Sequence, residues 1–490
     1  MALELSQQQV LTAIVLAIVS LVTWRLREGR SKPNLPPLVP YKWPILGSTF
    51  DFLKDPTDFT VSAYKKYGPV FRVNLRGHTQ AVVGKDQVRD IFLSTAFSYE
   101  EAVKEEFDLA DMLGTSKTKL EPHKLFAIVM TPYLGRFVPV AMNVLVKALQ
   151  DNLGTDKKAP VVVDNVFETI LDVMSRANAV CFFGEELGTN SELIPLFKQF
   201  AGQVGHWLSR KSPVLALFPT IAKTYLWVKF HISSPTAAYR NKVLKHALPI
   251  VNERRRQMRE YGDSYNAPVD SLQAYINSVP LDQPIDEFEL GTFILTLIFF
   301  SMHTTSKRTT YSLYNLAKYP QFIPDLLAEQ EATLGQDWSA ETVTHEQLKG
   351  LEKLDSFVRE TLRTSNRSIA LPHKIVGMDE WHLPGGYVLP KGTVVNINTE
   401  DIYYSPELQG PDPRTFNAWR FVGTDKSASR IGPDMVAFGL GRHTCPGRFF
   451  AVNEIKLALS LILRQYRISF PAGAQPSDSA PLVFTPIGAA

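Results

Sequence analysis

The chain holds only two cysteines, Cys181 and Cys445, among its 490 residues. Two thiols cannot cross-link a protein of this length into a disulfide framework, so a disulfide-built secreted protein is excluded and a reducing compartment is expected. Net charge is also small, because 52 Lys and Arg face 49 Asp and Glu, which gives +3. That balance excludes the strongly basic surface of a nucleic-acid-binding protein, and no nucleic-acid partner is predicted.

The sequence contains no internal repeat, no low-complexity block and no nicotinamide- or flavin-binding fingerprint. Hydrophobic residues make up 45% and charged residues 21% of the chain. These shares are ordinary for globular proteins, and they exclude a disordered, collagenous or polytopic membrane protein.

One long uncharged run occurs near the N-terminus, at residues 10–24, and Arg25, Arg27 and Arg30 follow it. As a helix this run rises about 22 Å, which approaches a thin bilayer such as that of the endoplasmic reticulum. The alternative is a cleaved signal peptide, but the arginines come after the run and no small-residue cleavage site follows. The positive-inside rule then leaves the rest of the chain in the cytosol.

We therefore predict three parts: a single-pass endoplasmic reticulum anchor at 1–30, a proline-rich linker at 31–47, and one catalytic domain at 48–490. Hydrophobic periodicity predicts that this domain is mainly α with small β-sheets, an α+β fold. Strands are expected at 70–75 and 80–83, around a turn at 76–78, and again between 374 and 398. The expected helices are 161–183, 197–208, 290–316, 348–363, and one from Cys445 to about Tyr466.

The segment with the clearest chemistry is Phe438-Gly-Leu-Gly-Arg-His-Thr-Cys-Pro-Gly447. Gly439 and Gly447 allow tight turns and a close approach to a flat ligand. Cys445 is expected to open the following helix, whose N-terminus favours thiolate and can donate N–H groups to the sulfur. A thiolate held in this way is an axial haem ligand that favours O–O cleavage. The competing interpretation is a glycine-rich turn with an inert buried cysteine.

This segment resembles the haem signature of the cytochrome P450 family, Phe-x-x-Gly-x-Arg-x-Cys-x-Gly. Arg442 directly follows Gly441 and stands one place early, so that His443 fills the usual arginine position. The resemblance implies the cytochrome P450 fold, in a eukaryotic microsomal type similar to fungal members, and haem b (iron protoporphyrin IX) with Cys445 as iron ligand. It also implies that Arg442 or His443 contacts a haem propionate and that Phe438 packs beside the sulfur. His123 and Lys124, at the start of an early helix, are further propionate candidates by the same resemblance.

Glu360 and Arg363 share one helix face, since they lie three residues apart. They precede Arg420 in the order typical of the family, whose glutamate and two arginines form a buried structural triad. Another Glu-x-x-Arg, Glu253 to Arg256, lies in a basic run and is expected to be a solvated face.

The predicted helix at 290–316 contains Phe300-Ser-Met-His-Thr-Thr305. It resembles the family's oxygen-binding segment, whose threonine helps deliver protons to dioxygen. Thr304 is the preferred threonine, with His303 in place of the usual acid. Phe300 then stands where the family has a small residue; a register one residue later puts Ser301 there and makes Thr305 the oxygen-side hydroxyl. A packed helix without a catalytic role is the third possibility.

The resemblance implies a monooxygenase that inserts one atom of O2 into a lipophilic small molecule, such as a terpenoid, a steroid or another secondary metabolite. Electrons would come from a separate NADPH-cytochrome P450 reductase. Two alternatives stay open: an O2-independent haem-thiolate isomerase or dehydratase, and a haem-binding sensor without turnover.

Overall fold

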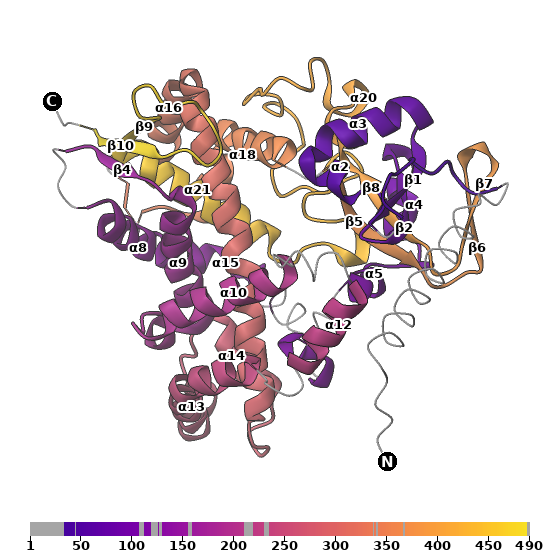
Figure 1. Cartoon of the computed structure of the whole chain (residues 1–490). Coiled ribbons are helices and arrows are strands. Elements are labelled where there is room, and N and C mark those ends of the chain that lie inside the picture. Colours follow the sequence, from indigo (N-terminus) through magenta and orange to yellow (C-terminus); the bar gives the residue numbers. More distant parts are fainter. Residues whose placement is uncertain are drawn as a thin grey trace, which may run out of the picture.

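The computed structural model describes residues 34–44, 46–106, 112–118, 126, 130–154, 159–209, 219–229, 235–336, 338–339, 342–365 and 368–487. The predicted anchor at 1–30, residues 31–33 and 45 of the predicted linker, His123 and Lys124 lie outside these residues. Figure 1 shows a helical side, built around the long helix α15, and a second side that carries most of the strands.

The helical side is formed mainly by six helices, which share an apolar core. They are α8 (Leu134–Leu153), α9 (Val166–Gly188), α10 (Leu193–Ser209), α13 (Pro235–Tyr261), α15 (Glu287–Lys318) and α21 (Arg448–Gln465). The 32-residue α15 begins where the Asp286 side chain accepts a hydrogen bond from the Glu289 N–H, an N-cap, and Pro320 follows shortly after its end. It is the one helix among the described residues that is long and apolar enough to cross a bilayer, but most of its apolar window is buried inside the protein.

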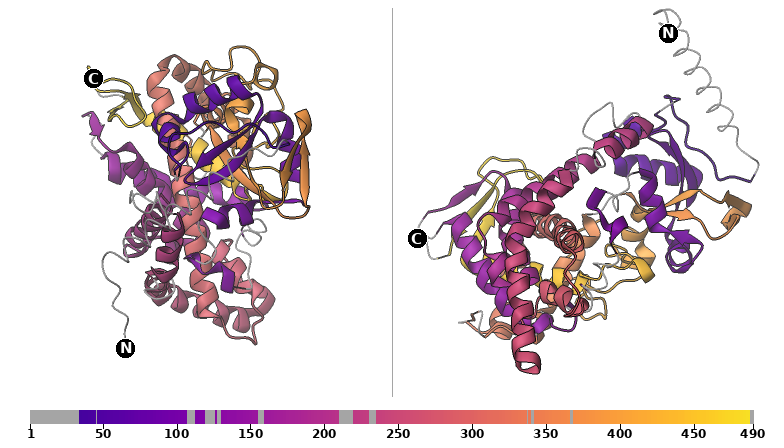
Figure 2. Two further views of the ribbon diagram at one scale, coloured as in Figure 1. Left: turned by 45° about the vertical axis from the view of Figure 1, so that its right-hand side comes forward. Right: turned by 90° about the horizontal axis from the view of Figure 1, so that it is seen from below.

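The remaining helices are shorter. They are α2 (Thr49–Lys54), α3 (Pro56–Tyr67), α4 (Val88–Leu93), α5 (Tyr99–Glu106), α12 (Pro219–Val228), α14 (Ser271–Ser278), α16 (Ile323–Leu334), α17 (His345–Gly350), α18 (Glu352–Thr364), α19 (Thr399–Tyr403) and α20 (Pro406–Gln409). Figure 2 shows the same arrangement from two further directions. Single 3₁₀ turns occur at Lys85–Gln87, Thr115–Lys117, Gly262–Ser264, Pro320–Phe322, Pro384–Gly386 and Gly441–His443.

The larger sheet has the strand order β1-β2-β8-β5-β3. Its strands are β1 (Val70–Leu75), β2 (His78–Val83), β8 (Val394–Asn398), β5 (Ile369–Ile375) and β3 (Phe97–Ser98). β1 and β2 are antiparallel, with Val70 opposite Val83, whereas β2 pairs with β8 in parallel. The hairpin turn is shorter than the sequence predicted, because Arg76 and Gly77 alone form it at φ +53° and +79°.

Two small sheets complete the fold. One has the order β4-β10-β9, from Val161–Val163, Leu482–Pro486 and Tyr466–Ser469. The other pairs β6 (Glu380–Leu383) with β7 (Tyr387–Pro390).

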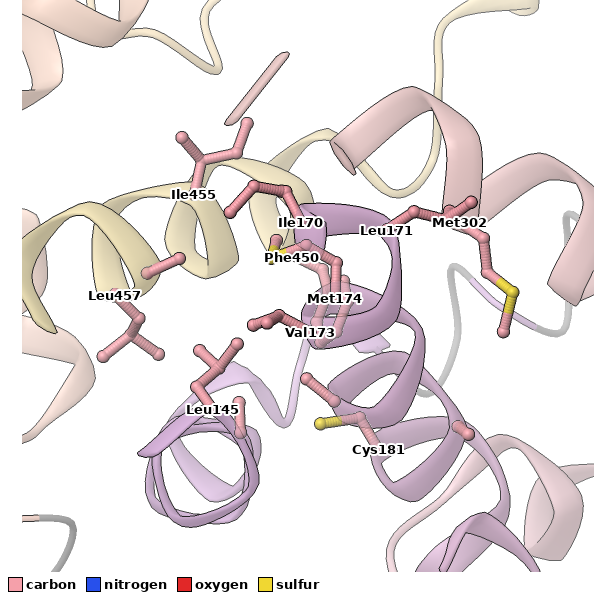
Figure 3. Packing of buried hydrophobic residues seen from close by; sticks show 14 of the residues in the cluster. Leu145, Ile170, Leu171, Val173, Met174, Cys181, Met302, Phe450, Ile455 and Leu457 are labelled. Atoms are coloured by element: carbon pink, nitrogen blue, oxygen red, sulfur yellow. The ribbon is translucent and has the colours of Figure 1, made fainter. Parts of the chain in front are cut away.

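Three apolar cores form the interior of the described part of the chain, and the cysteine loop lies where the two larger ones meet. The first core lies among the helices, and Figure 3 shows Cys181 and Met302 within it. The second lies between the large sheet and α4. Ala437 packs against both cores, Phe438 against the first and Leu440 against the second.

Three expected element boundaries were wrong. Residues 161–163 form a strand, and the helix starts only at Val166, because the Asn165 side chain caps it by accepting from the Glu168 N–H. The expected helix at 348–363 is two helices, α17 and α18, separated at Leu351. The helix after Cys445 begins at Arg448, with Gly447 as its N-cap, so the cysteine precedes the helix by three residues.

Candidate functional site

The cysteine loop is folded tightly onto itself. The Cys445 N–H donates to the Phe438 carbonyl over 2.8 Å, which closes the loop between these two residues. Gly439 has φ +73°, and a Cβ added there would lie 2.8 Å from the His443 carbonyl oxygen. Gly441 has φ +64° and would meet the Phe92 carbonyl at 3.0 Å. Both positions therefore require glycine, as the sequence indicated for Gly439.

The thiol of Cys445 lies at the N-terminal end of α21. Burial raises its pKa, while the backbone N–H groups of Gly447 and Arg448 hydrogen-bond the sulfur and lower the pKa, as does the Arg448 charge. A Cβ on Gly447 would lie 3.0 Å from the Phe126 ring and 3.9 Å from the Cys445 sulfur, so this glycine keeps space beside the thiol. Cys181 has a different environment: it is fully buried in the core, and burial raises the pKa of its thiol well above the usual value.

Arg442 and His443 form one hydrogen-bonded group with the segment that leads into α5. The Arg442 Nε–H donates to His443 Nε2 over 2.9 Å, and the Arg442 guanidinium also donates to the Phe97 carbonyl. Since Nε2 accepts, the Nδ1–H of His443 faces the Glu100 carboxylate, at 3.2 Å. Burial lowers the pKa of His443, and the Glu100 charge opposes this effect.

His373 joins this group, although the sequence did not single it out. Its ring lies 6.0 Å from the His443 ring between centroids, and the side chain is 1% exposed. Its Nδ1–H donates to the Leu371 carbonyl over 2.8 Å, while its Nε2 is buried with no hydrogen-bond partner among the described residues. Burial lowers the pKa of His373 to about 4. The available signal was a histidine within the Leu-Pro-His-Lys run of residues 371–374, where strands were expected to begin.

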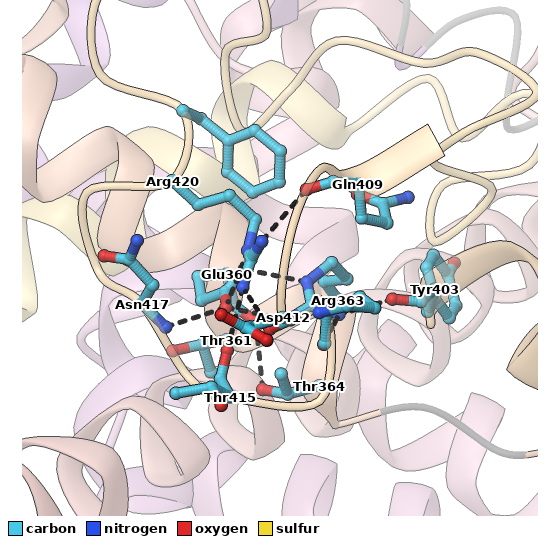
Figure 4. Close-up of polar contacts among 12 residues, drawn as sticks. Glu360, Thr361, Arg363, Thr364, Tyr403, Gln409, Asp412, Thr415, Asn417 and Arg420 are labelled. Carbon is cyan, nitrogen blue, oxygen red and sulfur yellow. Dashed lines mark hydrogen bonds and ion pairs between the residues drawn. The ribbon is translucent and has the colours of Figure 1, made fainter. Parts of the chain in front are cut away.

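Glu360, Arg363 and Arg420 meet in one buried network (Figure 4). Arg363 donates to both carboxylate oxygens of Glu360, over 2.8 and 2.7 Å, and Arg420 Nε–H donates to one of them over 3.2 Å. The Asn417 N–H is a further donor to Glu360 at 2.9 Å. The spare N–H groups of the two arginines reach backbone carbonyls of the loop that precedes the cysteine segment, those of Tyr403, Gln409, Pro411, Asp412, Pro413 and Thr415. The network therefore ties α18 to this loop and has no contact with a reacting group.

The two candidate threonines on α15 have opposite environments. Thr304 is exposed, and its hydroxyl donates to the Phe300 carbonyl over 2.8 Å, whereas Thr305 is 5% exposed. His303 faces α9, where its ring stacks on Phe167 with centroids 5.9 Å apart. Burial lowers the pKa of His303, and its Nε2 has no hydrogen-bond partner in the described part of the chain. At neutral pH the His303 imidazole is therefore uncharged.

Comparison with known proteins identifies the family. The protein-family model for cytochrome P450 matches residues 36–488 of this chain. The chain belongs to the cytochrome P450 family. Cytochrome P450 monooxygenase 71 of Postia placenta is 29% identical, over 95% of this chain and 93% of that protein. Cytochrome P450 monooxygenase penP of Penicillium crustosum is 28% identical over 70% of this chain and 65% of its own length.

A solved structure supports the same fold. Retinoic acid bound cyanobacterial CYP120A1 matches 93% of this chain and 100% of its own with a TM-score of 0.64, at 20% sequence identity. This P450 is thus a monooxygenase, as its named fungal relatives are, and it shares the family's use of haem iron, dioxygen, a lipophilic substrate and a redox partner.

The residues around Cys445 fit a haem. A haem iron needs a protein ligand, and the Cys445 thiol, whose sulfur is hydrogen-bonded by two backbone N–H groups, could supply it. His373 Nε2 is a buried polar atom that requires a partner, and a propionate carboxylate beside it would supply one and raise the pKa of His373. Arg442 offers a permanent positive charge in the same group.

Proposed function

We infer that this P450 is a haem-thiolate monooxygenase that binds haem b through Cys445 and oxidises a lipophilic secondary metabolite, such as a terpenoid or a steroid. The observation that carries the proposal is the Cys445 thiol, held at the start of α21 by the N–H groups of Gly447 and Arg448. When bound, the haem supplies the activation of dioxygen, and its iron charge keeps the cysteine sulfur deprotonated.

The protein side chains have separate tasks in this proposal. Arg442 and His373 bind the haem propionates, and His443 positions Arg442, since its Nε2 accepts from the Arg442 Nε–H. Thr304 holds a proton at its Oγ1 on the exposed face of α15. His303 acts beside it as a neutral imidazole that can take up and release a proton.

Electrons come from a separate NADPH-cytochrome P450 reductase in the endoplasmic reticulum membrane, because the chain carries no nicotinamide or flavin fingerprint. A membrane location also suits the apolar surface of α12, where Ile221, Tyr225 and Trp227 are 53%, 46% and 58% exposed. Such side chains can enter the lipid interface of a membrane.

The experiment is reconstitution of the full-length holoenzyme with the reductase, NADPH and ¹⁸O2, over a library of terpenoids and steroids. We expect NADPH consumption together with one labelled oxygen atom in the product. A product that forms without NADPH and without label would show an isomerase or dehydratase instead. Substrate-induced spectral change without any product would show a sensor.

A further inference from the structure

A cavity of about 470 Å³ lies between α17, α18, α21 and the loop of residues 421–429. This volume is within the range of cavities that bind small molecules. The described residues that line it include none of those to which the proposed function assigns haem binding or proton transfer. The cavity is therefore a separate space whose own chemistry decides what it can hold.

Lys456 lines this cavity from α21, although its side chain is only 2% exposed. Its Nζ donates one hydrogen bond, to Asp355 Oδ1 over 3.3 Å. An ammonium group has three N–H donors, so two donors of Lys456 have no partner among the described residues. Burial lowers the pKa of Lys456, while the charges of Asp355 and Glu329 oppose this shift. A buried ammonium with unused donors is costly, and an acceptor in the cavity would offset that cost.

The acidic side chains that line the cavity already have partners. Glu352 and Asp355 each accept a backbone N–H of the 421–429 loop, over 2.5 and 2.6 Å. Asp425 is paired with a neighbouring arginine. Lys426, a further lysine at the cavity, is paired with Asp434 at 3.0 Å. These four side chains therefore hold the loop in place, and their charges are largely compensated within the protein.

Other basic side chains keep donors for a ligand. The Nδ1 of His345 accepts from the Asn453 amide over 3.0 Å, so the proton of the ring is on Nε2, which has no partner within the described ranges. Lys349 is exposed at the rim, and its nearest carboxylate, that of Glu346, is 3.9 Å away. The unused hydrogen-bonding groups of the cavity are thus mostly N–H donors, and donors that carry a positive charge suit an anion.

The cavity also has apolar lining residues: Leu134 of α8, Phe421 of the loop, and Phe449 and Val452 of α21. An inorganic anion would leave this apolar surface in contact with water. A ligand with an apolar body would cover it and gain the free energy of that burial. The two kinds of lining residue together favour an anion that is attached to an apolar group.

We propose that this cavity binds a small organic carboxylate, whose anionic group accepts from Lys456 and His345 and whose apolar body lies against Phe449 and Leu134. The site is additional to the haem site, and the inference does not depend on the proposed function. Because the ligand would contact three helices and the 421–429 loop at once, its binding would stabilise the folded state.

The test is isothermal titration calorimetry of the full-length holoenzyme. The probes are 2-naphthylacetate, an aromatic carboxylate, and 2-(2-naphthyl)ethanol, its neutral counterpart. We expect 2-naphthylacetate to bind one to one, and the alcohol to bind about 10-fold more weakly, because it lacks charge-assisted hydrogen bonds. Inorganic phosphate should also bind more weakly, since it cannot cover the apolar residues. The haem Soret band, recorded in parallel, should not shift.

Lys456→Met should weaken 2-naphthylacetate binding about 10-fold and leave the affinity for the alcohol nearly unchanged. Lys349→Glu changes an exposed side chain, so the fold is not at risk, and it should weaken 2-naphthylacetate binding about 3-fold. Lys391→Glu is the matched control, because Lys391 is exposed, has the same 3.9 Å separation from a carboxylate, and is not a lining residue. Its dissociation constant should equal that of the wild-type protein.

The carbon-monoxide spectrum of each variant checks that the haem site is intact. The inference is overturned if the alcohol or phosphate binds as tightly as 2-naphthylacetate, or if Lys349→Glu and Lys391→Glu have equal effects. A Soret shift that follows the binding heat would also overturn it, since the probe would then be at the haem. The titration uses neither NADPH nor reductase, so its outcome is independent of whether turnover is observed.

Discussion

Arg363 donates two parallel hydrogen bonds to the Glu360 carboxylate, and both side chains are 0% exposed. Such a pair is stable only while both partners are present, because each would otherwise be a buried group without its counterpart. Glu360 also receives the Asn417 N–H and Arg420, so this single carboxylate joins α18 to the loop before the cysteine segment.

We therefore expect Glu360→Gln to destabilise the protein by about 3–5 kcal/mol, since the Arg363 charge would be left buried without a counter-ion. The measurement is urea unfolding followed by circular dichroism, with haem retention recorded in parallel. Glu253→Gln is the control, because the Glu253–Arg256 pair has the same spacing on an exposed helix surface. An equal effect of the two substitutions would contradict the structural role given to Glu360.

Cys445→Ala should abolish the red-shifted Soret band of the reduced carbon-monoxide complex, which requires a thiolate ligand. Cys181→Ala should keep this band, because Cys181 is fully buried in the helical core. The measurement is the reduced carbon-monoxide difference spectrum of both purified variants. Loss of the band in Cys181→Ala alone would show that the ligand was assigned to the wrong cysteine.

Thr304→Ala should keep the haem spectrum and NADPH consumption but divert most of the reducing equivalents to hydrogen peroxide. The reason is that Thr304 carries the exposed hydroxyl on α15, whereas Thr305 is buried. Peroxide and product are measured against NADPH consumed, with Thr304→Ser expected to restore much of the coupling. Should Thr305→Ala uncouple the enzyme while Thr304→Ala does not, the register shifted by one residue is the right one.

Glu454 should make stability depend on pH. It is 1% exposed on α21, and neither carboxylate oxygen has a hydrogen-bond partner of normal geometry among the described residues. Burial raises the pKa of Glu454 well above its usual value, with the neighbouring Asn178 amide opposing this shift. The folded state therefore binds a proton that the unfolded state has released above about pH 4.3.

Stability from this group is fully present below that pH and falls as pH rises toward the folded-state pKa, by up to about 1.4 kcal/mol per pH unit. Urea midpoints between pH 5 and pH 8 measure the slope. In Glu454→Gln, which cannot ionise, the slope should be shallower than in the wild-type protein. Parallel curves for the two proteins would show that Glu454 does not hold the proton.

Deletion of residues 1–30 should move much of the protein from the membrane pellet to the supernatant, with its haem retained. Part of the protein should stay bound through the exposed apolar side chains of α12. Fractionation of cells that express both forms is the measurement. A mature protein that starts near residue 30 would instead show that a signal peptide is cleaved there.

Features set by local chemistry were the ones that the sequence predicted well. The strand at Val70–Leu75, the helix around Leu290–Leu316 and the turning glycine Gly439 follow from periodicity or from backbone conformation. The Glu360–Arg363 spacing was also visible, but the backbone carbonyls that complete the network come from a loop about 40 to 55 residues later, which no local pattern reveals.

The wrong boundary at 161–163 and the missed His373 also arise from contacts between distant segments, which no local pattern reveals. A three-residue apolar run such as Val161–Val163 suits a helix and a strand equally, and its pairing with Leu482–Phe484 decides the outcome. His373 was missed because its importance comes from the approach of β5 to the cysteine loop, a contact between distant segments.

The position of the cysteine loop between the two larger apolar cores has a consequence for assembly. Phe438 packs against one core and Leu440 against the other, so the thiol reaches its place only after both cores have formed and docked. A porphyrin that binds between the two cores would hold them together, and its binding free energy would oppose their separation. The apoprotein should therefore unfold in more than one step, while the holoprotein unfolds in one.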